Sequence, residues 1–342
     1  MIRSVTKAAI QQYGFEVFGI EDGYEGLIFK RGHFLSWNDV SGILAQGGTI
    51  LGTSNTADPF RAAVPKGRKK IIFEDQSESA VQTFRDWKLD ALIAVGGDGT
   101  LRIAQKLFEK GIPVVGIPKT IDNDLWGTDY TFGFDTAVQI ATEAIDRLHT
   151  TAASHHRIML LEVMGRHAGW IAVYAGAAGG ADIILIPEIP FIMKKVCLEV
   201  NERAQKGRRF SLVVIAEGAH AKGDPPFSHE DKKNPYPLKL GGIANVLART
   251  VEEQTGLETR AAVLGHIQRG GTPSPFDRNL GTLFGHHAVE LVHAKKWGEM
   301  VCLVGQKIKS LPLRKAVGIS KKVPLNHPLI LSAKALGASF GI

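Results

Sequence analysis

Two aspartates follow apolar runs in this sequence. The run ALIAVGGDGT, residues 91–100, contains Asp98, and PKTIDND, residues 118–124, contains Asp122. In GGDGT the glycines permit a tight turn and a close approach of the backbone to a phosphate, while the first amides of a following helix would supply N–H donors. A bridging Mg²⁺ would reconcile the Asp98 carboxylate with that phosphate. The pattern therefore predicts a nucleotide and a metal, and the alternative is that Asp98 only caps a helix.

The TIDND stretch places Asp122 and Asp124 at alternate positions, beside Lys119 and Thr120. Carboxylates this close repel each other unless a cation or a substrate proton separates them. A carboxylate aimed at a hydroxyl group can act as general base, and a phosphoryl transfer needs cations around the moving group. Asp122 is therefore a candidate base, and the alternative is that these residues only build a turn.

Arginines recur at the boundaries of later apolar runs. Arg157 begins RIMLLEV and Arg166 follows it, whereas Arg260 and Arg269 belong to ETRAAVLGHIQRGG. Because a guanidinium group binds phosphate with two parallel hydrogen bonds, several such arginines predict a phosphorylated substrate. Taken singly, each arginine could instead form a surface ion pair, and His266 could be a structural histidine.

The elements that position these residues are short aliphatic runs separated by helical patterns. The runs are residues 16–20, 69–73, 91–95, 113–117, 157–163, 182–187 and 211–218. Continuous apolar runs of this length are typical of parallel strands covered on both faces, so the fold is predicted to be α/β and doubly wound. Ligands of such sheets bind at the carboxyl ends of the strands. A long helical pattern over residues 132–156 indicates a domain change near residue 134.

Composition excludes several classes of protein. The chain has 342 residues and a net charge of +7, but its basic residues are dispersed, which argues against nucleic-acid binding. No apolar run is long enough for a membrane helix, and residues 1–14 are typical of an amphipathic helix rather than of a signal peptide. Cys197 and Cys302 form no CxxC pair, so we expect a cytoplasmic protein without disulfides. Neither a Walker motif nor a GxGxxG fingerprint is present.

The motifs GGDGT, PKTIDND, EVMGRHAGW, IAEG and LGHIQRGG occur in an order that resembles the 6-phosphofructokinase family, from Met1 to about Gly318. The resemblance implies two Rossmann-like three-layer α/β domains with mostly parallel sheets, each discontinuous in sequence. We expect a large nucleotide-binding domain of residues 1–133 plus 268–317 and a smaller sugar-phosphate-binding domain of residues 134–267 plus 318–342. It also implies a glycolytic kinase that uses Mg²⁺ and ATP to phosphorylate the 1-hydroxyl of fructose 6-phosphate.

The same resemblance assigns roles to individual residues. Asp122 matches the general base, Arg166 a catalytic residue that offsets charge on the transferred group, and Asp98 the metal ligand. The donor-binding set is Gly97, Asp98, Gly99, Thr100 and Lys119. The substrate-binding set is Thr120, Ile121, Asp122, Arg157, Met164, Gly165, Arg166, Glu217, Arg260, His266, Ile267, Gln268 and Arg269. Arg157 and Arg260 match arginines that reach in from a neighbouring subunit, so a homo-oligomer, usually a homotetramer, is implied.

Two positions bear on the phosphoryl donor. Gly99 is similar to the ATP-using branch of the family, because pyrophosphate users have an aspartate there that would repel the α-phosphate of ATP. Lys119 is similar to the pyrophosphate branch, and the combination resembles a mixed-substrate subgroup that generally uses ATP. We therefore expect ATP, with pyrophosphate as the alternative. We also expect the family's first strand and its Gly-rich loop to be absent, which makes a non-catalytic sugar-phosphate-binding homologue a second alternative.

Overall fold

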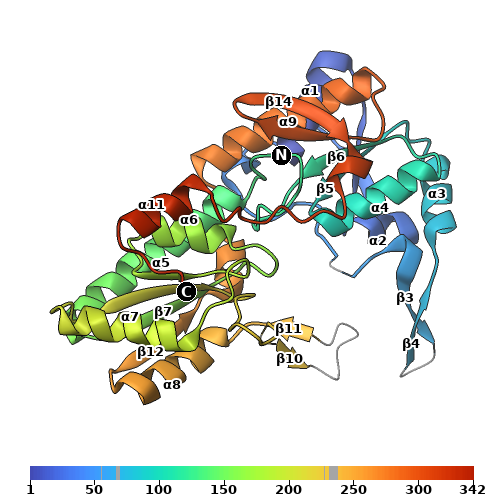
Figure 1. Ribbon diagram of the computed structural model, residues 1–342. Coiled ribbons are helices and arrows are strands. Elements are labelled where there is room, and N and C mark those ends of the chain that lie inside the picture. Colours follow the sequence, from blue (N-terminus) through green and yellow to red (C-terminus); the bar gives the residue numbers. More distant parts are fainter. Residues whose placement is uncertain (55, 67–69, 227, 231–237) are drawn as a thin grey trace. The chain divides into compact units, whose positions relative to one another are not determined.

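The structure, a computed structural model, describes residues 1–54, 56–66, 70–226, 228–230 and 238–342 (Figure 1). The chain forms two compact units, each assembled from separate segments. Unit 1 comprises Met1–Thr120, Leu125–Gly133 and Thr272–Ile319, and unit 2 comprises Ile121–Asp124, Phe134–Gly271 and Ser320–Ile342. These segments differ by a few residues from the expected domains, and the short segment Ile121–Asp124 belongs with unit 2 although its flanks belong to unit 1.

Unit 1 contains a four-stranded sheet in the order β14-β13-β6-β5. Strands β5, β6 and β13 are parallel, and β14 pairs antiparallel with β13. The strands are β5 (Leu92–Gly96), β6 (Val114–Pro118), β13 (Glu299–Val304) and β14 (Lys307–Pro312). The helices of this unit are α1 (Ile2–Tyr13), α2 (Tyr24–Phe29), α3 (Ser77–Asp86), α4 (Asp98–Glu109), α9 (Pro275–His293) and α10 (Leu313–Ala316), with 3-10 turns η1 (Ile43–Ala45) and η2 (Pro59–Arg61).

Successive residues of β6 point into two different apolar clusters of unit 1, one on each face of the sheet. Val114 packs in a cluster with Leu101 and Leu107 of α4, whereas Val115 packs with Phe284 of α9. Because successive side chains of a strand face opposite sides of a sheet, burial of both rows requires helices on both faces. Unit 1 is therefore a three-layer α/β structure.

Unit 2 contains a four-stranded, fully parallel sheet in the order β12-β7-β9-β8. The strands are β7 (Ile158–Val163), β8 (Ile183–Leu185), β9 (Ser211–Ala216) and β12 (Thr259–Val263). The helices are α5 (Phe134–His155), α6 (Trp170–Ala178), α7 (Met193–Gln205), α8 (Ile243–Thr255) and α11 (Pro328–Ala335), with the 3-10 turn η3 (Gly265–Arg269). Strand β10 (Ser228–Glu230) pairs antiparallel with β11 (Leu238–Leu240). Helices α7 and α8 share one core with the sheet, and α5 and α6 pack on β7, β8 and β9.

The α/β class with mostly parallel sheets is confirmed, but two predicted parallel strands are wrong. The run at residues 16–20 forms β1 (Val17–Ile20), which pairs antiparallel with β2 (Gly32–Leu35). The run at residues 69–73, whose first residue lies outside the described part, forms β4 (Lys70–Glu74), paired antiparallel with β3 (Ala62–Lys66). Only three residues connect β3 to β4, which is too few for the crossover that parallel pairing requires. Both pairs lie outside the two four-stranded sheets.

Candidate active site

The GGDGT segment joins β5 to α4 in unit 1, and its two outer glycines have different surroundings. A Cβ atom on Gly96 would lie 2.4 Å from the Thr100 hydroxyl oxygen, so Gly96 lets the first turn of α4 pack against the end of β5. A Cβ atom on Gly99 would have no heavy atom of the described residues within 4 Å, apart from its chain neighbours and the backbone of its own helix. The Thr100 carbonyl accepts a hydrogen bond from the Tyr24 hydroxyl at 2.8 Å, which holds this turn in place. The open space beside Gly99 suits a ligand phosphate.

Asp98 lies in the first turn of α4, where a carboxylate is favoured by the helix dipole. Its Oδ2 accepts a hydrogen bond from Arg102 Nε at 3.0 Å, and the Arg102 Nη2 also binds this oxygen. Its Oδ1 accepts a hydrogen bond from the Gly318 N–H at 2.7 Å. Asp98 therefore has a cation from its own helix and a backbone donor from a segment far along the chain.

Lys119 and Thr120 follow β6 at the same end of the unit 1 sheet. The Lys119 N–H donates to the Gly96 carbonyl at 2.8 Å, so the two strand ends are in register. The Thr120 carbonyl accepts a hydrogen bond at 2.7 Å from the hydroxyl of Thr131, a fully buried residue. A Cβ atom on Gly97 would lie 3.8 Å from the Thr120 Cβ, which is ordinary contact distance. Unit 1 thus brings a set of candidate residues together at the carboxyl ends of β5 and β6: Gly97, Asp98, Gly99, Thr100, Lys119 and Thr120.

The turn that carries Asp122 follows directly and belongs to unit 2. Its next residue, Asn123, is buried and has a positive φ of 51°. Few residues other than glycine adopt this left-handed conformation, and asparagine is one of those that tolerate it best. Asparagine at position 123 therefore suits the left-handed backbone of this turn.

Residues that follow β7, β9 and β12 form a connected cluster in unit 2. The Met164 N–H donates to Oε1 of Gln268 at 2.7 Å, and Arg269 Nε lies 3.3 Å from the Met164 sulfur. The Gly218 N–H donates to the Gly165 carbonyl at 3.2 Å. We call Met164, Gly165, Arg166, Glu217, Gln268 and Arg269 the acceptor cluster. His266 and Ile267 are exposed residues of the same turn, η3, as Gln268 and Arg269.

Tight backbone packing fixes this cluster. A Cβ atom on Gly218 would lie 2.1 Å from the Arg166 carbonyl oxygen. Gly165 has a φ of 136°, and a Cβ atom there would lie 2.8 Å from the Ala168 carbonyl oxygen. Both glycines are therefore required where the chain passes through the corner beyond β7 and β9.

Two polar groups of the cluster are notable for their burial. Burial raises the pKa of the Glu217 carboxyl, and the nearby Glu162 raises it further, while Arg269 and Arg166 act in the opposite direction. Gln268 is 1% exposed, and its amide nitrogen has no hydrogen-bond partner among the residues that the structure describes. A buried donor without a partner costs free energy, which a ligand acceptor would recover.

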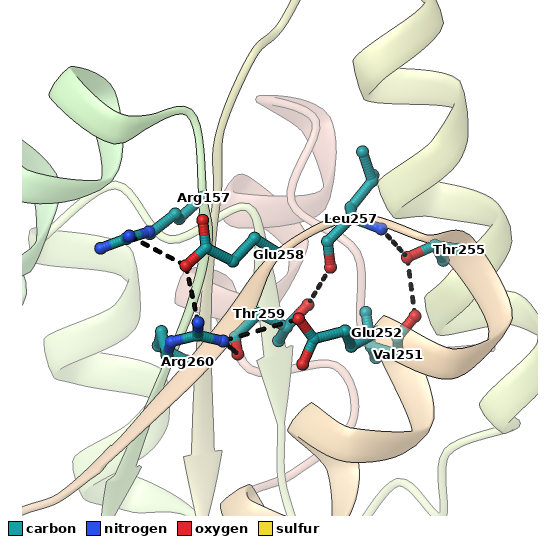
Figure 2. A network of polar contacts seen from close by, with 8 residues as sticks. All are labelled: Arg157, Val251, Glu252, Thr255, Leu257, Glu258, Thr259 and Arg260. Carbon is teal, nitrogen blue, oxygen red and sulfur yellow. Dashed lines mark hydrogen bonds and ion pairs between the residues drawn. The ribbon is translucent and has the colours of Figure 1, made fainter.

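Arg157 and Arg260 lie elsewhere in unit 2. Figure 2 shows both guanidinium groups around Glu258, with Arg157 Nη2 at 2.9 Å and Arg260 Nη2 at 2.6 Å from its Oε1. Arg260 also contacts Glu252 at 3.5 Å. The pKa of the Glu258 carboxyl is lowered, mainly by its hydrogen bond to Arg157 and to a smaller extent by the positive charge of Arg260. Arg157 precedes β7, whereas Arg166 follows it, so this pair and the acceptor cluster lie at opposite ends of the strand.

Sequence reasoning missed the partners of three site residues. Glu258 binds both arginines of the pair, and its spacing of two from Arg260 places both residues on one face of a strand, which could have suggested the contact. Arg102 lies four residues after Asp98, the spacing at which side chains of a helix meet. The Gly318 amide could not have been found this way, because it lies 220 residues from Asp98.

Membrane-spanning helices and clustered metal ligands are both absent from the described residues. No helix in the described part of the chain is both long and apolar enough to cross a membrane. Among the same residues, no group of three or more histidine, cysteine, aspartate or glutamate side chains is arranged to hold a metal ion. Cys197 and Cys302 are both buried free thiols.

Comparison with protein families gives a match to the model described as Phosphofructokinase over residues 1–292. This match covers most of the chain and contains every motif described above. The chain belongs to the phosphofructokinase family. Among its relatives in this family is ATP-dependent 6-phosphofructokinase 2 of Clostridium perfringens, which is 49% identical over 345 residues and covers 99% of this chain and 93% of the relative. ATP-dependent 6-phosphofructokinase of Chloroflexus aggregans is 48% identical over 342 residues, with 100% of this chain and 93% of the relative covered.

Solved phosphofructokinase structures have the same fold. Phosphofructokinase of Pichia pastoris in the T-state superposes with a TM-score of 0.79 at 30% identity, over 98% of this chain and 34% of that chain, so this chain spans about a third of that longer one. A pyrophosphate-dependent phosphofructokinase of Marinobacter aquaeolei gives a TM-score of 0.80 at 23% identity, over 99% of this chain and 84% of that chain. At that identity the likeness concerns the fold alone.

Proposed function

We propose that this protein is an ATP-dependent 6-phosphofructokinase, an enzyme that transfers a phosphoryl group from ATP to the 1-hydroxyl of fructose 6-phosphate. The observation that carries this proposal is the 48% to 49% identity to relatives of that name over nearly the whole chain. The residues of the two units supply the chemistry that the reaction needs. The product is fructose 1,6-bisphosphate, and the proposed location is the cytoplasm.

We assign the phosphoryl donor to residues of unit 1. The N–H groups at the start of α4 point toward the helix N-terminus, where they can bind phosphate oxygens, and the open space beside Gly99 leaves room for ATP. Gly97, Thr100 and the Lys119 cation complete the donor set. The single carboxylate of Asp98 fits Mg²⁺, which proteins commonly bind through one or two carboxylates together with substrate phosphates. When bound, Mg²⁺ would neutralise charge on the phosphates of the donor.

We assign the acceptor to residues of unit 2. Asp122 would take the proton from the 1-hydroxyl as that oxygen attacks phosphorus, and Arg166 would offset the negative charge on the transferred group. The rest of the acceptor cluster, with Thr120, Ile121, His266 and Ile267, would hold the sugar and its phosphate. The buried Gln268 amide donor and the Glu217 carboxyl group, whose pKa is raised mainly by burial, are suited to hydroxyl groups.

Arg157 and Arg260 are assigned to the substrate phosphate of a neighbouring subunit. β7 has six residues, which is a length of about 20 Å, and it separates these arginines from the acceptor cluster of their own chain. This separation is longer than a hexose phosphate, so both ends of the strand cannot bind one substrate molecule. An assembly of identical subunits removes the difficulty, and we propose a homotetramer.

Two alternative functions are less well supported than the ATP-dependent enzyme. A pyrophosphate-dependent enzyme is not favoured, because the similar relatives are named for ATP and Gly99 leaves the donor space open. A non-catalytic homologue is not favoured either, because the proposed catalytic residues Asp98, Asp122 and Arg166 are all present.

The test is a direct donor comparison. Purified protein is incubated with fructose 6-phosphate and Mg²⁺ and with either ATP or pyrophosphate, and fructose 1,6-bisphosphate is measured. We expect rapid formation with ATP and at least 100-fold slower formation with pyrophosphate. Faster turnover with pyrophosphate would overturn the donor assignment, and fructose 6-phosphate binding without turnover on either donor would support the non-catalytic alternative.

A further inference from the structure

The turn that carries Asp122 is bound by a segment from near the end of the chain. The Lys321 N–H donates to the Asp124 carbonyl at 2.7 Å. The Lys321 ammonium group donates to Oδ1 of Asn123 at 3.0 Å. Lys321 and the turn both belong to unit 2, although 198 residues separate Lys321 from Asn123. One residue therefore binds the turn through both its backbone and its side chain.

Lys321 is itself fixed by buried groups of unit 2. The Trp170 indole N–H donates to the Lys321 carbonyl at 2.7 Å, and the Lys321 ammonium group lies 5.3 Å from the Trp170 ring centroid, within range of a cation–π interaction. Trp170 is only 6% exposed. Two residues further on, the Val323 N–H donates to Glu188 at 2.9 Å, and Glu188 also accepts the Gly169 N–H at 3.1 Å. We call the contacts of Lys321 with Asn123 and Asp124 the clamp. Through Trp170 and Glu188 the clamp is anchored to the start of α6.

The turn needs such support for a physical reason. Asn123 has a φ of 51° and is 1% exposed, so a non-glycine residue is held in the left-handed region inside the protein. This conformation costs of the order of 1 kcal/mol and persists only where surrounding contacts determine it. Asp122 is the preceding residue, and a change in the Asn123 backbone would redirect the Asp122 carboxylate.

We propose that Lys321 is a positioning residue for the general base, which it holds in its reactive orientation through Asn123 and Asp124. This inference rests on the proposed function, because it matters for turnover only if Asp122 takes the proton from the acceptor. A base displaced by about 1 Å can lose about 100-fold in rate. The clamp therefore acts on the rate of transfer rather than on the affinity for the sugar phosphate.

The first test compares three variants of the full chain with fructose 6-phosphate and MgATP. Lys321→Met should lower kcat about 10-fold to 100-fold and change KM for fructose 6-phosphate less than threefold, and Lys321→Arg should recover most of the loss. Lys322→Met is the matched control, because Lys322 is the exposed neighbour and its side chain makes neither bond to the turn. The control should retain wild-type kcat. A Lys321→Met variant that is folded by thermal denaturation and has wild-type kcat would overturn the proposal.

The second test is a double-mutant cycle with Asn123→Gly, which keeps the left-handed backbone accessible but removes the Oδ1 acceptor. Asn123→Gly should lower kcat by a factor similar to that of Lys321→Met, and the double variant should lose no more than either single variant. If the losses in kcat of the two single variants multiply in the double variant, the result would contradict the clamp. If Lys321→Met does not fold, a wild-type kcat in Asn123→Gly would contradict the clamp as well. A wild-type protein without ATP-dependent turnover would instead refute the proposed function, whereas an active wild type with unaffected variants would refute only the clamp.

Discussion

Gly99 of unit 1 and Gly218 of unit 2 each follow closely after a parallel strand, but their surroundings differ. In the described part of the chain, a Cβ atom on Gly99 would meet no tertiary neighbour within 4 Å, whereas a Cβ atom on Gly218 would lie 2.1 Å from the Arg166 carbonyl oxygen. Gly99 also lies within α4, where alanine is intrinsically more favourable than glycine. Gly218 is therefore explained by packing of the protein on itself. Packing does not explain Gly99, whose open space is available to a ligand.

The same contrast extends to the proposed catalytic carboxylates. Asp98, a member of the proposed donor-binding set, is bound by the side chain of Arg102, which is 57% exposed and belongs to the same helix. Asp122, the proposed general base, belongs to a turn that Lys321 links to the buried Trp170. A metal ligand on the donor side can exchange an exposed partner for a cation. A general base must keep one orientation, which a well-anchored turn provides.

The largest expected effect is that of Asp122→Ala. Removal of a general base commonly costs about 100-fold to 10,000-fold, so we expect kcat to fall about 1,000-fold. The affinity for fructose 6-phosphate, measured by calorimetric titration, should change less than fivefold because the rest of the acceptor cluster is intact. Normal turnover in this variant would show that another group takes the proton.

The matched pair Gly218→Ala and Gly99→Ala tests the contrast between the two glycines. We expect Gly218→Ala to lower the free energy of unfolding by about 3 kcal/mol, because the added methyl group overlaps the Arg166 backbone. We expect Gly99→Ala to raise it by about 0.5 to 1 kcal/mol and yet to weaken ATP use. Urea denaturation measures both values, and changes of the same sign would contradict the comparison.

The charge at position 99 is a sharper test of the donor assignment. Gly99→Asp places a carboxylate in the open space, and repulsion of the ATP phosphates should lower kcat/KM for ATP about 10-fold. Gly99→Asn is the matched control, since it has the same size without the charge. If both variants lose activity equally, the effect is steric, and if neither does, the space beside Gly99 does not receive the donor.

A smaller effect is expected for Arg102→Gln. Asp98 and Arg102 lie one helical turn apart and form an exposed ion pair. Its loss should therefore change the free energy of unfolding by less than about 0.5 kcal/mol. The Mg²⁺ concentration for half-maximal activity should fall about twofold, because the cation no longer competes with the guanidinium for Asp98. A Mg²⁺ titration at fixed ATP measures this, and a higher Mg²⁺ requirement would mean that Arg102 supports the donor site instead.

The smallest predicted effect concerns the pH dependence of stability. Burial, followed by the charge of Glu162, raises the pKa of Glu217 in the folded protein, so the ionised form is less stable there than in the unfolded chain. Its contribution to stability is therefore fully present below the unfolded pKa and is lost as the pH rises through the folded pKa. Glu217→Gln should raise the Tm by about 2 °C at pH 8. This gain should disappear near pH 4, and the exposed Glu253→Gln should show no such trend; a gain that persists at pH 4 would contradict this explanation.

Much of the fold could be predicted because its signals are local. The continuous apolar runs at residues 91–95, 113–117 and 157–163 correspond to β5, β6 and β7, since burial on both faces leaves few polar positions in such a strand; Glu162 of β7 is an exception. The prediction for residues 16–20 is wrong because a local signal does not identify the strand with which a run pairs. This run forms β1, which pairs with β2 outside the two four-stranded sheets. The roles of the site residues, and the division into nucleotide-binding and sugar-phosphate-binding domains, stay predictions.

The sequence by itself determined the α/β class, the family and the set of candidate site residues, because glycine turns, apolar runs and charged motifs depend on residue types within a few positions of one another. The tertiary structure decided which residues hold that set in place. Lys321 reaches Asn123 across 198 residues, and Gly318 reaches Asp98 across 220. No local pattern encodes such contacts, since the distance between two residues far apart in the chain depends on how every element between them packs.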